Sequence, residues 1–299
     1  EPDFAEGSFL SRRGALHIGR AEDAPLRDAQ IAAFADTALF TRVDGAALGA
    51  AVPGLRADWT IGLAEPTTCD IDVAALHGAY LKRLRARGGT LACSARFENA
   101  RPLPGGGWAV RLGGGEEVRT SLLINAAGAW ADDVAHMCGV RALGIVPMLR
   151  TVAQVRVAAP VADDLPIVLD LSERFYFKAI GGGRLWLTPH DEQHCAPGDV
   201  APDALDIAIA IDRLSQAVDW HVEAVERKWA GLRSFAPDRL PVYGHDAEAP
   251  GFFWFAGQGG FGIQTAPAAA RLGAALLLGQ DDPLLASLDT KIYSPARLR

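Results

Sequence analysis

The chain has 299 residues, a formal net charge of −7 and an apolar content of 49%. Its length predicts about two domains with a sizeable core, and its acidic balance argues against nucleic acid or an anionic membrane as a partner. No apolar run reaches the ~18 residues of a membrane span. The cysteines are widely spaced without a C-x-x-C pair, which is typical of a reducing compartment. A cytoplasmic location is expected, with a membrane-peripheral or exported protein as the alternative.

The first third of the chain predicts helices. Two are expected at Pro25–Thr37 and Gly45–Ala51. Asp72 should cap an amphipathic helix that runs to Arg87 and ends at Gly88-Gly89. The residues expected on one face of this helix are Val73, Leu76, Tyr80 and Leu84.

Strands dominate the middle of the chain. The first group is expected at Thr90–Phe97, Trp108–Leu112, Glu116–Arg119 and Leu122–Asn125, ahead of a helix from Ala131 to Cys138. A second, antiparallel group is expected at Thr151–Val157, Ile167–Asp170, Phe175–Ile180 and Leu185–Leu187. A crossover helix and a returning strand follow at Asp203–Val218 and Val222–Ala230. The triple glycines at 105–107, 113–115 and 181–183 are interpreted as hairpin turns.

A histidine-rich stretch runs from His190 to Cys195. Its H-x-x-x-H spacing would suit a metal site on a helix, but Pro189 and Pro197 flank it. We interpret the stretch as a polar loop and predict no metal.

The most informative segment runs from Phe252 to Gly279. It predicts a buried strand at Phe252–Ala256, a glycine-packed turn, and a helix from about Thr265. Glycines let the backbone approach a planar ligand and leave N–H groups free to donate, while the helix directs its positive end at the same place. Such a turn suits a ring that becomes negative during reaction. The alternative is a glycine-rich strand-to-helix turn without a ligand.

Two further segments accompany this turn, namely SLLINAAGAWAD (Ser121–Asp132) and KWAGLRSFAPDRLPVYG (Lys228–Gly244). Together the three resemble the D-amino-acid oxidase family of FAD enzymes. With DIDVAALHGAYL (Asp70–Leu81), the nearest likeness inside the family is to the D-arginine dehydrogenases. The resemblance covers nearly the whole chain.

The resemblance implies a mixed α/β fold, in which a Rossmann-like FAD-binding domain is interleaved with an antiparallel-sheet substrate domain. The FAD-binding domain is expected at 70–142 and 232–285, the substrate domain at 1–69 and 143–231, and a tail at 286–299. The family opens with a strand, a G-x-G-x-x-G turn and a helix. We expect no such βαβ unit in this chain and interpret it as N-terminally incomplete, because of a segment outside these residues, a separately encoded piece or a genuine truncation.

The resemblance also implies site residues. Arg233 would grip a substrate carboxylate bidentately; the alternative is an arginine paired structurally, for example with Asp238. Tyr176 would donate to the same carboxylate, and Arg150 matches a second active-site arginine. The residues implied for FAD are Phe97, Ala126, Ala127, Gly128, Trp130, Gly257, Gln258, Gly259, Gly260, Phe261, Gly262 and Ile263. No cysteine lies in the GLRSF or GQGGFG segments, so the FAD is expected to be noncovalent.

The implied reaction oxidises the Cα–N bond of a D-amino acid by hydride transfer to the flavin. The imine product hydrolyses to a 2-oxo acid and ammonia. The electron acceptor is left open: it is oxygen in an oxidase, and a quinone or another carrier in a dehydrogenase. Ala15 stands where the D-arginine dehydrogenases carry a glutamate for the substrate guanidinium, so a cationic substrate is not favoured. The alternatives are a non-catalytic or partner-completed FAD-binding subunit, and a flavoenzyme of the same fold acting on a secondary amine or a hydroxy acid.

Overall fold

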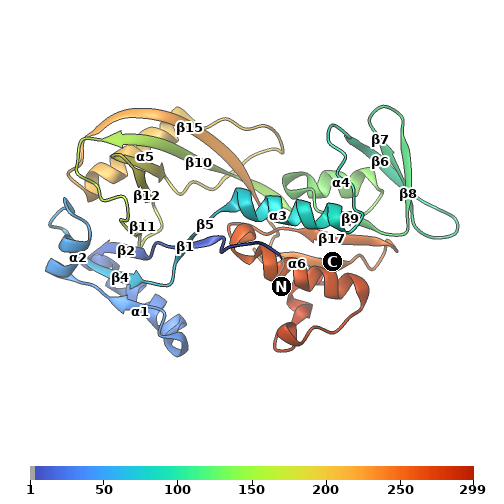
Figure 1. Ribbon diagram of the computed structural model, residues 1–299, viewed down its shortest axis with the longest axis horizontal. Helices are drawn as coiled ribbons and strands as arrows, with labels where there is room; N and C mark the ends of the chain where they lie inside the picture. The colour runs from blue at the N-terminus through green and yellow to red at the C-terminus, as the bar shows by residue number, and fades with distance from the viewer. Residues whose placement is uncertain (1–3) are drawn as a thin grey trace. The chain divides into compact units, whose positions relative to one another are not determined.

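The computed structural model describes residues 4–299, which form two compact units (Figure 1). Unit 1 comprises the described residues up to Tyr80 together with Leu149–Gln193 and Val200–Gly231. Unit 2 comprises Leu81–Met148, His194–Asp199 and Leu232–Arg299. Three long elements, α3, β10 and β15, each continue from one unit into the other along the chain.

Unit 1 is built on a mixed sheet with the strand order β14-β10-β13-β12-β11-β2-β4-β3, in which β15 also pairs with β10. The strands are β2 (Ala15–Arg20), β3 (Thr41–Arg42), β4 (Trp59–Glu65), β10 (Val146–Val157), β11 (Ile167–Asp170), β12 (Tyr176–Gly181), β13 (Arg184–Thr188), β14 (Gln193–His194) and β15 (Val222–Phe235). A separate pair joins β1 (Leu10–Arg12) to β5 (Cys69–Ile71). The expectation of a purely antiparallel sheet is corrected at one place, because β2 and β11 are parallel.

Helices cover one face of this sheet through a shared apolar core. The predicted crossover helix is present as α5 (Ala204–Ala217), which Asp203 caps by accepting from the backbone N–H of Leu205 at 2.8 Å. The helix buries Ile207, Ala210 and Leu214 in the same cluster as Phe177 and Leu187 of the sheet, and α2 (Gly45–Ala51) adds Leu48. The other unit 1 helix is α1 (Ala24–Ala33), which is shorter than expected.

Unit 2 contains two small sheets and two helices. The hairpin sheet β6-β7-β8 consists of β6 (Phe97–Pro102), β7 (Trp108–Leu112) and β8 (Glu117–Thr120). The second sheet, β16-β17-β9, consists of β9 (Leu123–Asn125), β16 (Val242–His245) and β17 (Phe252–Ala256). The helices are α4 (Ala131–Met137) and α6 (Gly262–Leu278). Each of the triple glycines joins two paired strands, so the interpretation as hairpin turns is confirmed.

One sequence-based expectation, the strand at 90–97, needs correction, and the helix predicted from Asp72 is present. Residues 90–96 are not a strand, because Ser94 adopts a left-handed φ of 59° that interrupts the extended run, and β6 begins only at Phe97. Helix α3 (Val73–Ala86) is capped by Asp72, which accepts from the N–H of Ala75 at 2.9 Å. Its apolar face is nevertheless exposed: Val73 and Leu84 are each 43% accessible.

A buried carboxylate holds the end of the unit 2 core together. Asp246 accepts from the indole N–H of Trp254 at 2.9 Å and from the backbone N–H of Glu248 at 2.9 Å, and it pairs with Arg299. Burial raises the pKa of Asp246, but these hydrogen bonds and the charge of Arg299 outweigh burial, so the pKa lies below its ordinary value.

We therefore expect Asp246→Ala to lower the free energy of unfolding by about 3–5 kcal/mol, because Arg299 and the Trp254 N–H lose a buried partner. The folded-state pKa is depressed, so this stabilisation is present above the ordinary Asp pKa of about 3.9 and is lost as the pH falls below it. Urea unfolding at pH 7 and at acid pH measures both effects. The control is Glu117→Ala, which removes an exposed ion-pairing carboxylate and should cost less than about 1 kcal/mol. Equal losses for the two variants would contradict the expectation.

Candidate functional site

Two loops of small residues meet at one end of the β16-β17-β9 sheet. Strands β9 and β17 are parallel, with Asn125 opposite Trp254, so both chains leave the sheet at the same edge. The loop after β9 carries Ala126, Ala127 and Gly128, and the turn after β17 starts at Gly257. In open α/β sheets, ligands bind outside the carboxyl ends of such strands.

The loop after β9 is shaped by Asn125. Its side chain is buried, donates to the carbonyl of Ala131 at 2.7 Å and accepts from the N–H of Ala127 at 3.3 Å. These bonds fold the loop back toward the start of α4 and leave Trp130 46% exposed. The loop therefore presents small residues and one accessible aromatic ring.

The turn after β17 requires glycine for a steric reason. Gly259 has a φ of 56°, and a Cβ placed there would lie 2.6 Å from Cε1 of Phe235. Helix α6 begins at Gly262, three residues earlier than the predicted start at Thr265. Gly257 to Gly262 also have the G-x-G-x-x-G spacing between a strand and a helix. This spacing does not by itself make the βαβ unit that the family opens with, because only short 3₁₀ segments follow α6 within residues 4–299.

Backbone bonds tie the end of β15 to this turn. Phe235 forms an antiparallel bridge with Gln258, and the N–H of Gly259 donates to the carbonyl of Ser234 at 2.8 Å. The guanidinium of Arg233 consequently lies against Gly260: a Cβ on Gly260 would be 3.1 Å from its Nη1 atom. A cationic fork is thus fixed beside the glycine turn.

Arg233 is not part of a structural ion pair. Asp238, the partner considered in the sequence analysis, is instead bound by Arg297, whose Nε and Nη2 atoms lie 2.6 Å and 3.0 Å from its carboxylate oxygens. Hydrogen bonding from Arg297 holds the pKa of Asp238 below its ordinary value. Within residues 4–299, Arg233 has no hydrogen bond or ion pair, so its donors are available to a ligand.

The remaining predicted residues lie in different surroundings. Tyr176 is the first residue of β12, opposite Thr188 of β13, and is partly exposed. Arg150 is 5% exposed in β10, with Glu192 at 3.4 Å and Asp191 at 4.0 Å. Both belong to unit 1, whereas the glycine turn, Arg233 and Phe97 belong to unit 2. Phe97 packs against the unit 2 core.

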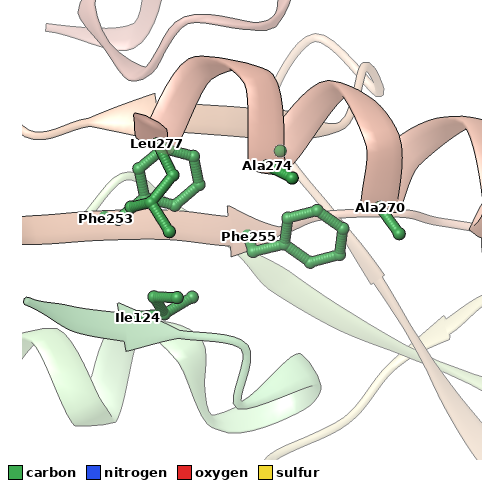
Figure 2. A pocket seen from close by; sticks show the side chains of 7 residues that line it. Ile124, Phe253, Phe255, Ala270, Ala274 and Leu277 are labelled. Carbon is green, nitrogen blue, oxygen red and sulfur yellow. The ribbon is translucent and has the colours of Figure 1, made fainter. Parts of the chain in front are cut away.

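An apolar pocket lies on the α6 side of the same sheet (Figure 2). It encloses about 280 Å³, and its lining residues are Ile124, Phe253, Phe255, Ala270, Gly273, Ala274 and Leu277. Figure 2 shows Ile124 and Phe255 on the strands facing Ala270 and Ala274 of the helix. None of these side chains carries a charge or a hydrogen-bonding group, so this pocket does not offer the donors that a carboxylate requires.

Two residues that shape the site escaped the sequence analysis. Asn125 was expected only as the last residue of a strand, although an amide at a strand end can form local hydrogen bonds to the following loop. Ser234 acts through its backbone carbonyl, for which the side chain gives no signal. In the described part of the chain, no group of three or more His, Cys, Asp or Glu residues could hold a metal. No helix there is long and apolar enough to cross a membrane.

Comparison with known proteins agrees with these features. A family model described as FAD dependent oxidoreductase (DAO) matches residues 4–276. Mitochondrial dimethylglycine dehydrogenase of Mus musculus is 26% identical over 258 residues, which are 78% of this chain and 29% of that protein. Glycine oxidase of Pseudomonas aeruginosa is 29% identical over 182 residues, 60% of this chain and 47% of that protein. The chain therefore spans less than half the length of either relative.

Solved structures share the fold. Glycine oxidase from Geobacillus kaustophilus superposes with a TM-score of 0.81 at 19% identity, covering 97% of this chain and 76% of that one. L-Proline dehydrogenase from P. horikoshii gives a TM-score of 0.80 at 19% identity, covering 96% and 77%. At this level of identity the likeness establishes the mixed α/β fold, which confirms the predicted fold class.

The glycine turn can be tested by itself. Gly259→Ala should lower the unfolding free energy by about 1–2 kcal/mol for the left-handed backbone and by a further 1–3 kcal/mol for the clash with Phe235. Gly139→Ala is the matched control, because Gly139 also has a positive φ, of 68°, but has open space at its Cβ position. It should show the backbone cost alone. Denaturant unfolding of both variants measures the difference, and similar losses would mean that Phe235 yields to the added methyl group.

Proposed function

This chain belongs to the FAD dependent oxidoreductase (DAO) family, and from that premise we propose that it oxidises the Cα–N bond of a small amino acid, with D-amino acids as the preferred class. In this proposal unit 2 carries the residues that bind the flavin end of FAD, and Tyr176 and Arg150 are proposed as substrate residues of unit 1. The reaction gives an imine that hydrolyses to a 2-oxo acid and ammonia. The observation that carries the proposal is the unpaired Arg233 guanidinium held against Gly260.

The residues present fit the ring of FAD. Two loops lie at the carboxyl edge of parallel strands, and at Gly259 a side chain would collide with the neighbouring strand. The N-terminus of α6, a 17-residue helix, follows directly and favours negative charge nearby. The loop from Ala126 to Trp130 and the turn from Gly257 to Ile263 would hold the group noncovalently, because neither contains a cysteine. When bound, FAD supplies the hydride acceptor.

Arg233 binds the substrate carboxylate in this proposal. A guanidinium presents parallel N–H donors that match a carboxylate bidentately, which fixes the direction of the Cα–H bond. Its backbone is tied to the glycine turn through Ser234 and Phe235, so the cation and the turn keep a constant spacing. Tyr176 and Arg150 are proposed as further substrate contacts. Arg150 would act within its ion pairs to Asp191 and Glu192.

The substrate class is drawn from the likeness to the D-arginine dehydrogenases, with one difference. Ala15 is 4% exposed in β2 and offers no carboxylate to a guanidinium. Neutral D-amino acids are therefore preferred to D-arginine in this proposal. The names of the similar proteins support a second candidate, a secondary or tertiary amine that carries a carboxylate, such as N,N-dimethylglycine. The same Arg233 would bind either class.

Arg233→Lys tests the grip on the carboxylate. We expect the KM for the amino acid to rise about ten- to hundredfold, since a point charge cannot reproduce a bidentate bond worth roughly 1.5–3 kcal/mol. Flavin content, read from the visible spectrum of protein supplied with FAD, should stay unchanged. Arg119→Lys is the control, because Arg119 is an exposed arginine of β8. Loss of flavin with unchanged kinetics per bound flavin would show that Arg233 supports the fold instead.

Substrate class is tested by kcat/KM with an artificial electron acceptor. The panel contains D-alanine, D-phenylalanine, D-arginine, glycine, sarcosine, N,N-dimethylglycine and L-proline. We expect neutral D-amino acids to equal or exceed D-arginine, because a lost charged hydrogen bond is worth about ten- to hundredfold. A hundredfold preference for D-arginine would refute the argument from Ala15. Turnover of sarcosine or N,N-dimethylglycine alone would favour the second candidate, and no turnover by flavin-loaded protein would favour a non-catalytic subunit.

A further inference from the structure

Two strained residues face each other at one end of the unit 1 sheet. Glu173 and His190 have left-handed φ values of 56° and 57°, although neither is glycine. The imidazole Nδ1 of His190 lies 2.5 Å from the backbone carbonyl of Glu173. A carbonyl can only accept, so Nδ1 carries the proton and the ring is fixed against rotation. Left-handed backbone at non-glycine residues persists only where the surroundings enforce it, and it is concentrated at functional sites.

The turn before β12 and helix α5 hold this backbone in place. The turn before β12 is held by the buried Asp170, which accepts from Nε of Arg174 at 2.6 Å and from the N–H of Ser172 at 3.3 Å. Arg213 of α5 donates to the carbonyl of Pro189 at 2.7 Å and also to the carbonyl of Arg174. One arginine thus fastens the loop before β12 to the loop after β13.

This arrangement surrounds Tyr176. The His190 ring meets the Tyr176 ring edge to face, with centroids 5.7 Å apart and an interplanar angle of 77°. The backbone N–H of His190 donates to Oγ1 of Thr188, the residue opposite Tyr176 in the sheet, at 3.2 Å. The next two residues of the loop, Asp191 and Glu192, form the ion pairs with Arg150. The loop therefore contacts both substrate residues proposed for unit 1.

We propose that His190 is a positioning residue for Tyr176: its ring, locked to the Glu173 carbonyl, holds the phenol in the orientation in which it donates to the substrate carboxylate. The inference rests on the proposed role of Tyr176 in substrate binding. An edge-to-face pair restricts the plane of the phenol without forming a bond to its hydroxyl. The left-handed backbone at His190 brings its ring against Tyr176 and the Glu173 carbonyl, so the strained conformation serves to place the ring.

The first test observes Tyr176 directly, without substrate. The chain has four tyrosines, so protein labelled with 3-fluorotyrosine gives a simple ¹⁹F spectrum in which Tyr176→Phe identifies the Tyr176 line. We expect His190→Ala and His190→Asn to move that line and leave the other three in place. Asparagine tolerates the left-handed conformation, so His190→Asn preserves the loop while removing the ring. Ser94→Ala, at another left-handed residue, is the control and should change nothing. An unmoved Tyr176 line would overturn the inference.

The second test couples the two residues kinetically. His190→Ala should raise the KM for the substrate about two- to tenfold, as expected for an aromatic pair, while kcat per bound flavin changes less than about twofold. The rise should vanish in a Tyr176→Phe background, because His190 then has no hydroxyl to position. An equal rise in both backgrounds would overturn the inference. A moved ¹⁹F line with an unchanged KM would support the positioning and count against the role of Tyr176 in the proposed function.

Discussion

The parallel pairing of β9 with β17 is the constraint on which the candidate site depends. Parallel strands deliver their carboxyl ends to one edge, so residues more than a hundred positions apart along the chain converge there. The other unit 2 residues of the site are fixed relative to this edge. Asn125 folds the first loop, the crowding of Gly259 against Phe235 fixes the second, and the bridge to Gln258 attaches the end of β15 to it.

The two units hold their proposed functional side chains by different means. In unit 2, Arg233 is placed by backbone bonds of its neighbours, and its guanidinium lies against Gly260 with no side-chain partner among the described residues. In unit 1, Tyr176 and Arg150 are placed by side chains of one loop, through the ring of His190 and the carboxylates of Asp191 and Glu192. Backbone placement suits a group that must remain available to a ligand. Side-chain placement suits groups whose direction must be set.

Local sequence patterns predicted the elements with local causes. The Phe252–Ala256 strand, the Gly45–Ala51 helix and the cap at Asp72 all depend on neighbouring residues, and the structure has them where predicted. Partners distant in sequence were not predictable in the same way. Asp238 forms its ion pair with Arg297, which lies 59 positions further along the chain. Strand β2 (Ala15–Arg20) pairs with β11 (Ile167–Asp170), which is also distant in sequence. In β2, Leu16 and Ile18 are buried on either side of the partly exposed His17, and this spacing in the sequence is a usable signal for a strand. The strand expected at 90–97 is interrupted at Ser94, which has a left-handed backbone conformation. The residue types around Ser94 do not predict this conformation.

The backbone tie between β15 and the glycine turn has a consequence for how such a protein can change over time. A bond from the N–H of Gly259 to the carbonyl of Ser234 survives replacement of the serine by almost any residue, and the bridge between Phe235 and Gln258 survives in the same way. Substitutions at Ser234 and Gln258 can therefore accumulate while the backbone bonds keep Arg233 in position. A lineage built on this tie can change its substrate contacts by small steps without first losing the position of Arg233, the residue proposed to bind a carboxylate.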